Sequence, residues 1–82
     1  MYRARIRITL RPSILDPQGK AVHHAIGALG TAGVQDVRMG KYVEMKLEAA
    51  SPGEAQRITE EVCRKLLANP VMEDFHFEIE AL

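Results

Sequence analysis

The sequence predicts an α+β domain in which two helices pack on one face of a four-stranded antiparallel sheet. Apolar and polar residues alternate with a period of two near both ends of the chain and in its middle. Two other stretches carry apolar residues at helical spacing, and each begins with a capping residue followed by proline. With 82 residues, the chain has the length of one small domain. We therefore expect a single domain over residues 1–82, with elements in the order β-α-β-β-α-β.

The first strand is predicted over residues 2–11 because its two faces differ completely. One face is apolar, and the other carries Arg3, Arg5, Arg7, Thr9 and Arg11. The apolar face consists of Tyr2, Ala4, Ile6, Ile8 and Leu10. Pro12 ends this strand.

The first helix is predicted to begin at Asp16-Pro17, where an N-cap acceptor precedes a proline at the first helical position. Apolar residues then recur at helical spacing over about three turns, and Gly30 or Gly33 ends the run. The residues of this stripe are Val22, Ala25, Ile26 and Leu29.

A β-hairpin is predicted next, with Gly40-Lys41 as its two-residue turn. Its first strand is short and contains Val34, Val37 and Met39. In the return strand, Val43, Met45 and Leu47 alternate with Glu44, Lys46 and Glu48.

The second helix is predicted to begin at Ser51, followed by Pro52 and by Glu54 as the partner of a capping box. Asn69-Pro70 ends it. Its predicted buried stripe is Ala55, Ile58, Val62 and Leu66. In the last strand, Phe75, Phe77 and Ile79 alternate with Asp74, His76, Glu78 and Glu80.

This element order is that of the ferredoxin-like folds, in which the first strand lies centrally beside the third and the fourth. The arginines of the first strand would then face glutamates on both neighbouring strands: Glu44, Glu48, Glu78 and Glu80. Residues 1–41 carry seven basic and two acidic side chains (+5), and residues 42–82 carry four basic and nine acidic (−5). We expect the two halves to neutralise each other in the sheet or across an oligomer.

Composition argues against several classes of function. Eleven basic and eleven acidic side chains give no net charge, which disfavours binding to nucleic acid or to an anionic membrane. Phe75 and Phe77 lie on the inward register, so the arginine face lacks the exposed aromatics of RNA-binding sheets. No apolar run approaches the ~20 residues of a membrane span. With one cysteine and arginines interrupting its N-terminal apolar stretch, the chain is expected to be cytoplasmic.

No set of residues has the spacing of a catalytic or metal site. His23 and His24 point about 100° apart on a helix, so they cannot bind one metal from one face. Cys63 borders the apolar stripe of the second helix and is predicted to be an inert thiol. The segment Gly30-Thr31-Ala32-Gly33 follows a helix, whereas a phosphate-binding loop precedes one. We expect no active site and no bound cofactor.

Three segments together resemble the PurS family, the small subunit of phosphoribosylformylglycinamidine (FGAM) synthase. They occur in order over nearly the whole chain. The third commonly ends in tyrosine, where this chain has Phe75, which keeps the ring and removes a hydroxyl. The segments are Ile14-Leu15-Asp16-Pro17-Gln18-Gly19, Val37-Arg38-Met39-Gly40-Lys41 and Leu66-Leu67-Ala68-Asn69-Pro70-Val71-Met72-Glu73-Asp74-Phe75.

The resemblance implies a non-catalytic subunit of an enzyme of de novo purine synthesis. A PurQ-type glutaminase would release ammonia from glutamine. A PurL-type synthetase would use it, with ATP and Mg²⁺, to convert formylglycinamide ribonucleotide to FGAM. This chain would bridge the two as a homodimer or homotetramer. We expect Asp16, Pro17, Arg38 and Lys41 to contact partners or other copies, because motif and expected exposure coincide there.

Two other functions are compatible with the predicted topology. One is a regulatory domain that senses a small molecule at a dimer interface, with Gly30-Thr31-Ala32-Gly33 as the ligand loop. The other is a small enzyme of the acylphosphatase type, which needs a phosphate-binding loop after the first strand. Arg11-Pro12-Ser13-Ile14 has no glycine there, so this possibility ranks last.

Overall fold

A computed structural model describes all 82 residues as a three-stranded antiparallel sheet with two helices. The strands are β1 (Tyr2–Leu10), β2 (Gly40–Leu47) and β3 (Glu73–Ala81), and the helices are α1 (Pro17–Ala28) and α2 (Pro52–Val62). A π-helical turn, η1 (Cys63–Leu67), continues α2. The α+β class is therefore confirmed. So is the central position of β1, because the strand order is β2-β1-β3.

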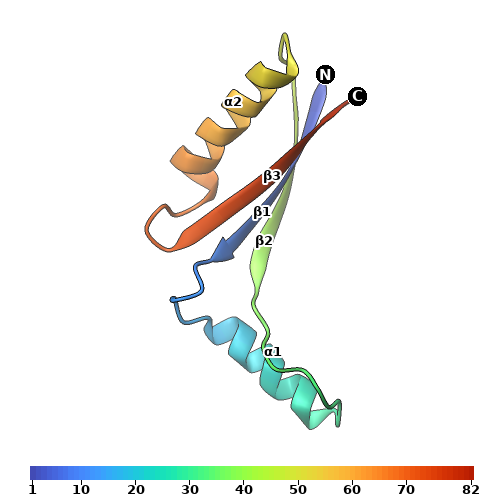
Figure 1. Cartoon of the computed structure of the whole chain (residues 1–82), viewed down its shortest axis with the longest axis vertical. Helices are drawn as coiled ribbons and strands as arrows, with labels where there is room; N and C mark the ends of the chain where they lie inside the picture. The colour runs from blue at the N-terminus through green and yellow to red at the C-terminus, as the bar shows by residue number, and fades with distance from the viewer.

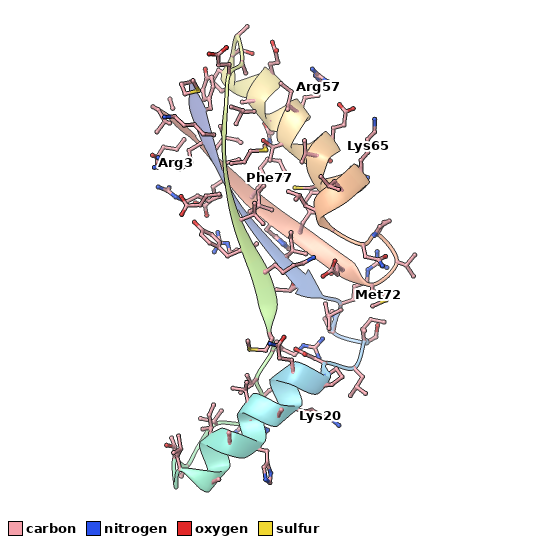
Figure 2. The ribbon with its side chains drawn as sticks, turned by 180° about the vertical axis from the view of Figure 1, so that it is seen from behind. Arg3, Lys20, Arg57, Lys65, Met72 and Phe77 are labelled. Carbon is pink, nitrogen blue, oxygen red and sulfur yellow. The ribbon has the colours of Figure 1, made fainter.

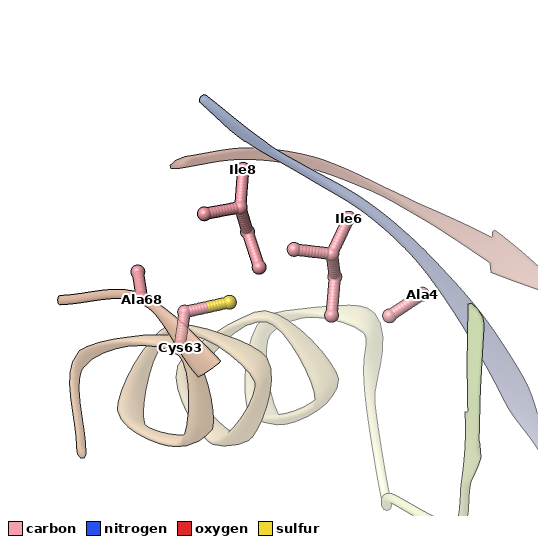
Figure 3. Close-up of a cluster of buried hydrophobic side chains, with 5 residues drawn as sticks. All are labelled: Ala4, Ile6, Ile8, Cys63 and Ala68. Atoms are coloured by element: carbon pink, nitrogen blue, oxygen red, sulfur yellow. The ribbon is translucent and has the colours of Figure 1, made fainter. Parts of the chain in front are cut away.

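The core lies between one face of the sheet and α2 with its π-helical turn. Ala4, Ile6 and Ile8 of β1 point toward Cys63 and Ala68 across this interface (Figure 3). All but Ala68 are fully buried, and Ala68 is nearly so. Phe77 of β3 lies between the sheet and α2, while Arg3 projects from the opposite side (Figure 2). The predicted inward and outward faces of the strands are confirmed.

The predicted hairpin is wrong. Gly40 and Lys41 lie inside β2, paired with Thr9 and Ile8 of β1, and residues 31–39 form no strand. The sheet thus has three strands in place of the four expected. A Cβ atom at position 40 would lie 2.5 Å from the carbonyl oxygen of Ile8. Glycine is therefore required there for a close approach of two strands, and not for a turn.

The expectation that both helices pack on one face of the sheet is also wrong. Only α2 covers the sheet, whereas α1 extends beyond its end, on the side opposite the two termini (Figure 1). The radius of gyration is 16.2 Å, compared with about 12 Å for a compact domain of this length. Helical spacing predicts that α1 buries a face, but it does not specify which surface covers that face.

The outer face of the sheet carries the predicted ion pairs. Arg3 pairs with Glu44 at 3.8 Å, Arg5 with Glu80 at 2.7 Å and Arg7 with Glu78 at 2.6 Å. Each arginine pairs with the glutamate diagonal to it, two residues along the neighbouring strand from its direct cross-strand partner. The hydrogen bond and charge of Glu80 raise the pKa of Arg5. Glu48 of the predicted set takes part in no ion pair.

Both helices begin where the caps predict. The carboxylate of Asp16 accepts the backbone N–H of Gly19, and the hydroxyl of Ser51 accepts that of Glu54. α1 ends at Ala28, and Gly30 follows in the left-handed region with φ of 82°.

The predicted buried stripe of the second helix is wrong at Leu66. That side chain is 78% exposed, and the buried positions are Ala55, Thr59 and Cys63. The N–H of Ala68 donates to the carbonyl of Cys63, five residues earlier. This wider turn rotates the end of the helix away from the α-helical register, so Leu66 faces outward.

Candidate interaction surface

The chain has no deep cleft. A hollow of about 210 Å³ is open to solvent between the end of α2 and the start of β3. Arg11, Arg64, Glu73 and Asp74 contribute to its lining, and Arg11 pairs with Asp74 at 3.4 Å. Because its charges balance, nothing in it selects a ligand of one sign. The surface features of the chain therefore carry the functional interpretation.

The most prominent of these features is an arm, which we define as residues 11–39. In the arm, α1 leads away from the sheet and residues 31–39 return to it (Figure 1). A ring nitrogen of His23 lies 2.7 Å from the carbonyl oxygen of Val34, so the returning segment runs beside the helix. We call the remaining residues, the sheet with α2 and η1, the body.

Asp16 lies at the base of the arm and is only 5% exposed. Its carboxylate accepts the N–H of Gly19 at 2.9 Å and that of Met39 at 2.7 Å. These two hydrogen bonds, and then the positive charge of Arg38, lower the pKa of Asp16. The expected exposure of Asp16 is therefore wrong, because the cap also bonds a segment distant in sequence.

Arg38 is the second predicted contact residue at this base. Its guanidinium donates to the carbonyl of Arg11 at 2.9 Å and to that of Ile14 at 3.0 Å. Both acceptors belong to the connection between β1 and α1. Arg38 therefore ties the returning segment to the outgoing one, while its side chain remains accessible.

Gly19 is a residue of the base that the sequence patterns did not single out for this role. A Cβ atom there would overlap both the carbonyl oxygen of Val37 and the carboxylate of Asp16. Only glycine therefore allows the first turn of α1 to approach the returning segment this closely. The sequence indicated this role only through the position of Gly19 in the segment 14–19, which resembles the PurS family, two residues after Pro17.

The other two predicted contact residues differ in their surroundings. Pro17 is exposed on the first turn of α1, beside Asp16. Lys41 lies in the body, where its ammonium donates to the carbonyl of Leu67 at 3.2 Å and lies 3.6 Å from Glu73. The structure thus brings Asp16, Pro17 and Arg38 together and separates Lys41 from them. Their contact with partners stays a prediction.

Several large apolar side chains are exposed where the sequence predicted a core or gave no signal. Leu29 at the end of α1 is 82% exposed, although it belongs to the predicted buried stripe of that helix. Others lie on both the arm and the body: Leu15, Val34, Tyr42, Leu66, Val71 and Met72. Apolar surface of this extent on a small chain is typical of protein–protein contact.

The other candidates from the sequence were the thiol of Cys63, a glycine-bounded ligand loop, a metal site and a membrane span. Cys63 is fully buried, and this burial raises the pKa of its thiol. The alternative ligand loop, residues 30–33, follows the end of α1 at the far tip of the arm (Figure 1), and a Cβ atom at Gly30 or Gly33 would meet no other atom within 4 Å. No group of three His, Cys, Asp or Glu side chains is arranged to hold a metal ion. None of the helical segments has both the length and the apolar character needed to cross a membrane.

Comparison with known proteins gives consistent matches over nearly the full length. Residues 3–81 match the family model described as PurS, phosphoribosylformylglycinamidine (FGAM) synthase. The FGAM synthase subunit PurS of Synechocystis sp. is 49% identical over 81 residues, which is 99% of this chain and 81% of that relative.

Two solved structures share the fold. The PurS structure from Bacillus subtilis aligns with a TM-score of 0.88 and 44% identity over 99% of this chain and 100% of that one. A chain in the structure of PurLQS from Thermotoga maritima aligns with a TM-score of 0.89 and 25% identity over 96% of both chains. The similarity therefore includes the arm as well as the body.

Proposed function

The chain belongs to the PurS family of FGAM synthase, and we propose that it is the non-catalytic subunit that joins the glutaminase to the synthetase. FGAM synthase belongs to purine biosynthesis, and the chain is a subunit of it. In the proposed role, ammonia released from glutamine reaches formylglycinamide ribonucleotide without leaving the complex. ATP and Mg²⁺ would be bound by the synthetase, and this chain would bind no cofactor.

The observation that carries the proposal is the open shape of the chain. Only nine of 82 residues are buried, and α1 has almost no contact with the sheet. A chain of this shape leaves much of its apolar surface for other chains to cover. It also offers two separate surfaces, the arm and the body, so that one subunit can hold two partners.

The proposed partners are a PurL-type synthetase and a PurQ-type glutaminase. The similar Thermotoga maritima chain comes from a structure of PurLQS. Joining two active sites raises the local concentration of the transferred molecule, as a tether does for a bound ligand. The compartment proposed for this complex is the cytoplasm.

Self-association as a homodimer or homotetramer is part of the proposal. The absence of net charge removes the repulsion that keeps small proteins apart. The apolar residues along the inner face of the sheet are only partly buried by α2, including Val43, Met45, Phe75, Phe77 and Ile79. A second copy could complete the burial of this face.

Reconstitution tests the proposed function. The synthetase and glutaminase of the same organism would be mixed with and without this chain, and FGAM formation from glutamine would be followed. We expect turnover only with the chain present, while a high concentration of ammonia supports the synthetase without it. Glutamine-dependent turnover that is the same without the chain would contradict the proposal.

A further inference from the structure

Two segments lie against each other at the base of the arm and are joined by side chains. The outgoing segment connects β1 to α1, and the returning segment enters β2. Asp16 on the outgoing segment accepts the N–H of Met39 on the returning one at 2.7 Å. In the other direction, Arg38 donates to the carbonyls of Arg11 and Ile14. The three bonds form a reciprocal clasp between the two segments.

Helix capping alone does not account for this arrangement. A cap requires only the bond from the N–H of Gly19 to the carboxylate of Asp16. Ser51 provides the comparison within the same chain, since it caps α2 through Glu54 and bonds no distant segment. The bond to Met39 spans 23 residues, and Arg38 belongs to no cap. The start of the helix therefore does not require the bonds of the clasp.

Within one chain, the direction of the arm depends on its base, because no other part of the chain packs firmly against α1. Once past the clasp, α1 is not packed against the sheet (Figure 1). Each bond of the clasp includes a charged donor or acceptor, and such bonds are stronger than neutral ones. The carboxylate of Asp16 is also shielded from water. A loosened clasp would let the arm move relative to the body without unfolding either part.

We infer that Asp16 and Arg38 are positioning residues, which hold the arm at a fixed orientation to the body so that both can dock in FGAM synthase at once. The docking half of this inference rests on the proposed function. The orientation half concerns this chain and can be tested without the glutaminase or the synthetase.

Substitutions can separate positioning from capping. Asp16→Ser keeps a good N-cap, but its one oxygen cannot take the places of both Oδ1, which accepts from Gly19, and Oδ2, which accepts from Met39. Arg38→Lys keeps the positive charge, but its ammonium lies one bond nearer the backbone than the terminal nitrogen of Arg38 that donates to both carbonyls. Asp36→Asn is the matched control, because the carboxylate of Asp36 bonds only the adjacent N–H of Val37 in the same arm.

Spin labels would measure the orientation. They would be attached at His24→Cys on α1 and Gln56→Cys on α2, both exposed positions, while the fully buried Cys63 stays unlabelled. Excess unlabelled chain would suppress distances between copies. We expect one narrow distance distribution in the doubly labelled parent and in Asp36→Asn, and broad distributions in Asp16→Ser and Arg38→Lys. Equal widths in all four proteins would overturn the inference.

Reconstituted FGAM synthase would measure the docking. We expect half-maximal glutamine-dependent turnover to require at least about a tenfold higher concentration of Asp16→Ser or Arg38→Lys than of the parent. Ammonia-dependent turnover should be unchanged. Unchanged hydrogen exchange in β1 would show that the body remains folded. If the variants show broadened distance distributions but support glutamine-dependent turnover as well as the parent does, the docking half of the inference is overturned. If the parent itself fails to couple, the proposed function fails while the distance measurement still decides the orientation.

Discussion

Among single residues, Gly19 and Gly27 offer a direct comparison of two glycines in one helix. Gly19 is pressed against the returning segment, whereas a Cβ atom at Gly27 would meet nothing within 4 Å. We expect Gly19→Ala to lower the free energy of unfolding by about 1–3 kcal/mol, because atoms must move apart. Gly27→Ala should raise it by about 0.5–1 kcal/mol, since alanine favours the helix. Urea unfolding of both variants measures the difference, and similar losses in both would contradict the close approach at Gly19.

Asp16 provides a prediction about pH. Its folded-state pKa is lowered by the bonds from Gly19 and Met39, so its contribution to stability is fully present above its unfolded pKa of about 3.9. That contribution is lost as the pH falls through the folded pKa. The parent should therefore be more stable than Asp16→Asn at neutral pH, and this difference should shrink below about pH 4.

Unfolding curves of the parent and Asp16→Asn between neutral and acid pH would test this dependence. Gly27→Ala is the control, because that substitution introduces no titrating group and its effect should not follow the same course. A difference between the parent and Asp16→Asn that stays constant to low pH would refute the role of the ionised carboxylate.

Local sequence predicted the caps at these positions but not their tertiary role. Asp16 and Ser51 each precede a proline, and an N-cap bond reaches only three residues along the chain. The bond from the N–H of Met39 to the carboxylate of Asp16 depends on how the arm folds back. No local spacing specifies that path, so the burial of Asp16 could not be predicted.

Between elements, the packing of β1 against α2 and η1 provides most of the buried core. Ile6 is fully buried there, while Leu66, from the same predicted core, is 78% exposed. We expect Ile6→Ala to cost about 2–5 kcal/mol and Leu66→Ala to cost less than about 0.5 kcal/mol. Chemical denaturation at low protein concentration measures both. A large loss for Leu66→Ala would mean that this side chain packs into the core.

The alternation of apolar and polar residues was enough to predict the three strands and their two faces. The register of β1 with β2 and β3 pairs apolar with apolar residues over most of one face, and places arginines beside glutamates on the other. The hairpin prediction failed because glycine serves equally in a turn and in a close approach of strands. At Gly40 the nearby carbonyl of Ile8 decides between the two, and that contact spans the sheet.

For the whole molecule, the extended shape predicts association. The principal extents are 51 × 27 × 14 Å, too elongated for the chain to cover its own apolar surface. If folding is coupled to association, the melting temperature should rise with protein concentration. Light scattering after gel filtration should give a mass above the 9.1 kDa of one chain. A 9.1 kDa species with a concentration-independent melting temperature would contradict the proposed self-association.

The sequence by itself determined three strands and two helices in their order, the caps and the two faces of each of these strands, because these features depend on residues a few positions apart. It also carried the segments that identify the family. The tertiary structure alone decided that α1 leaves the sheet, that residues 31–39 return without forming a strand, and that Asp16 and Arg38 meet across the base of the arm. The physical reason is that an apolar helical face requires burial but does not specify its partner. In this chain, the sheet does not cover that face.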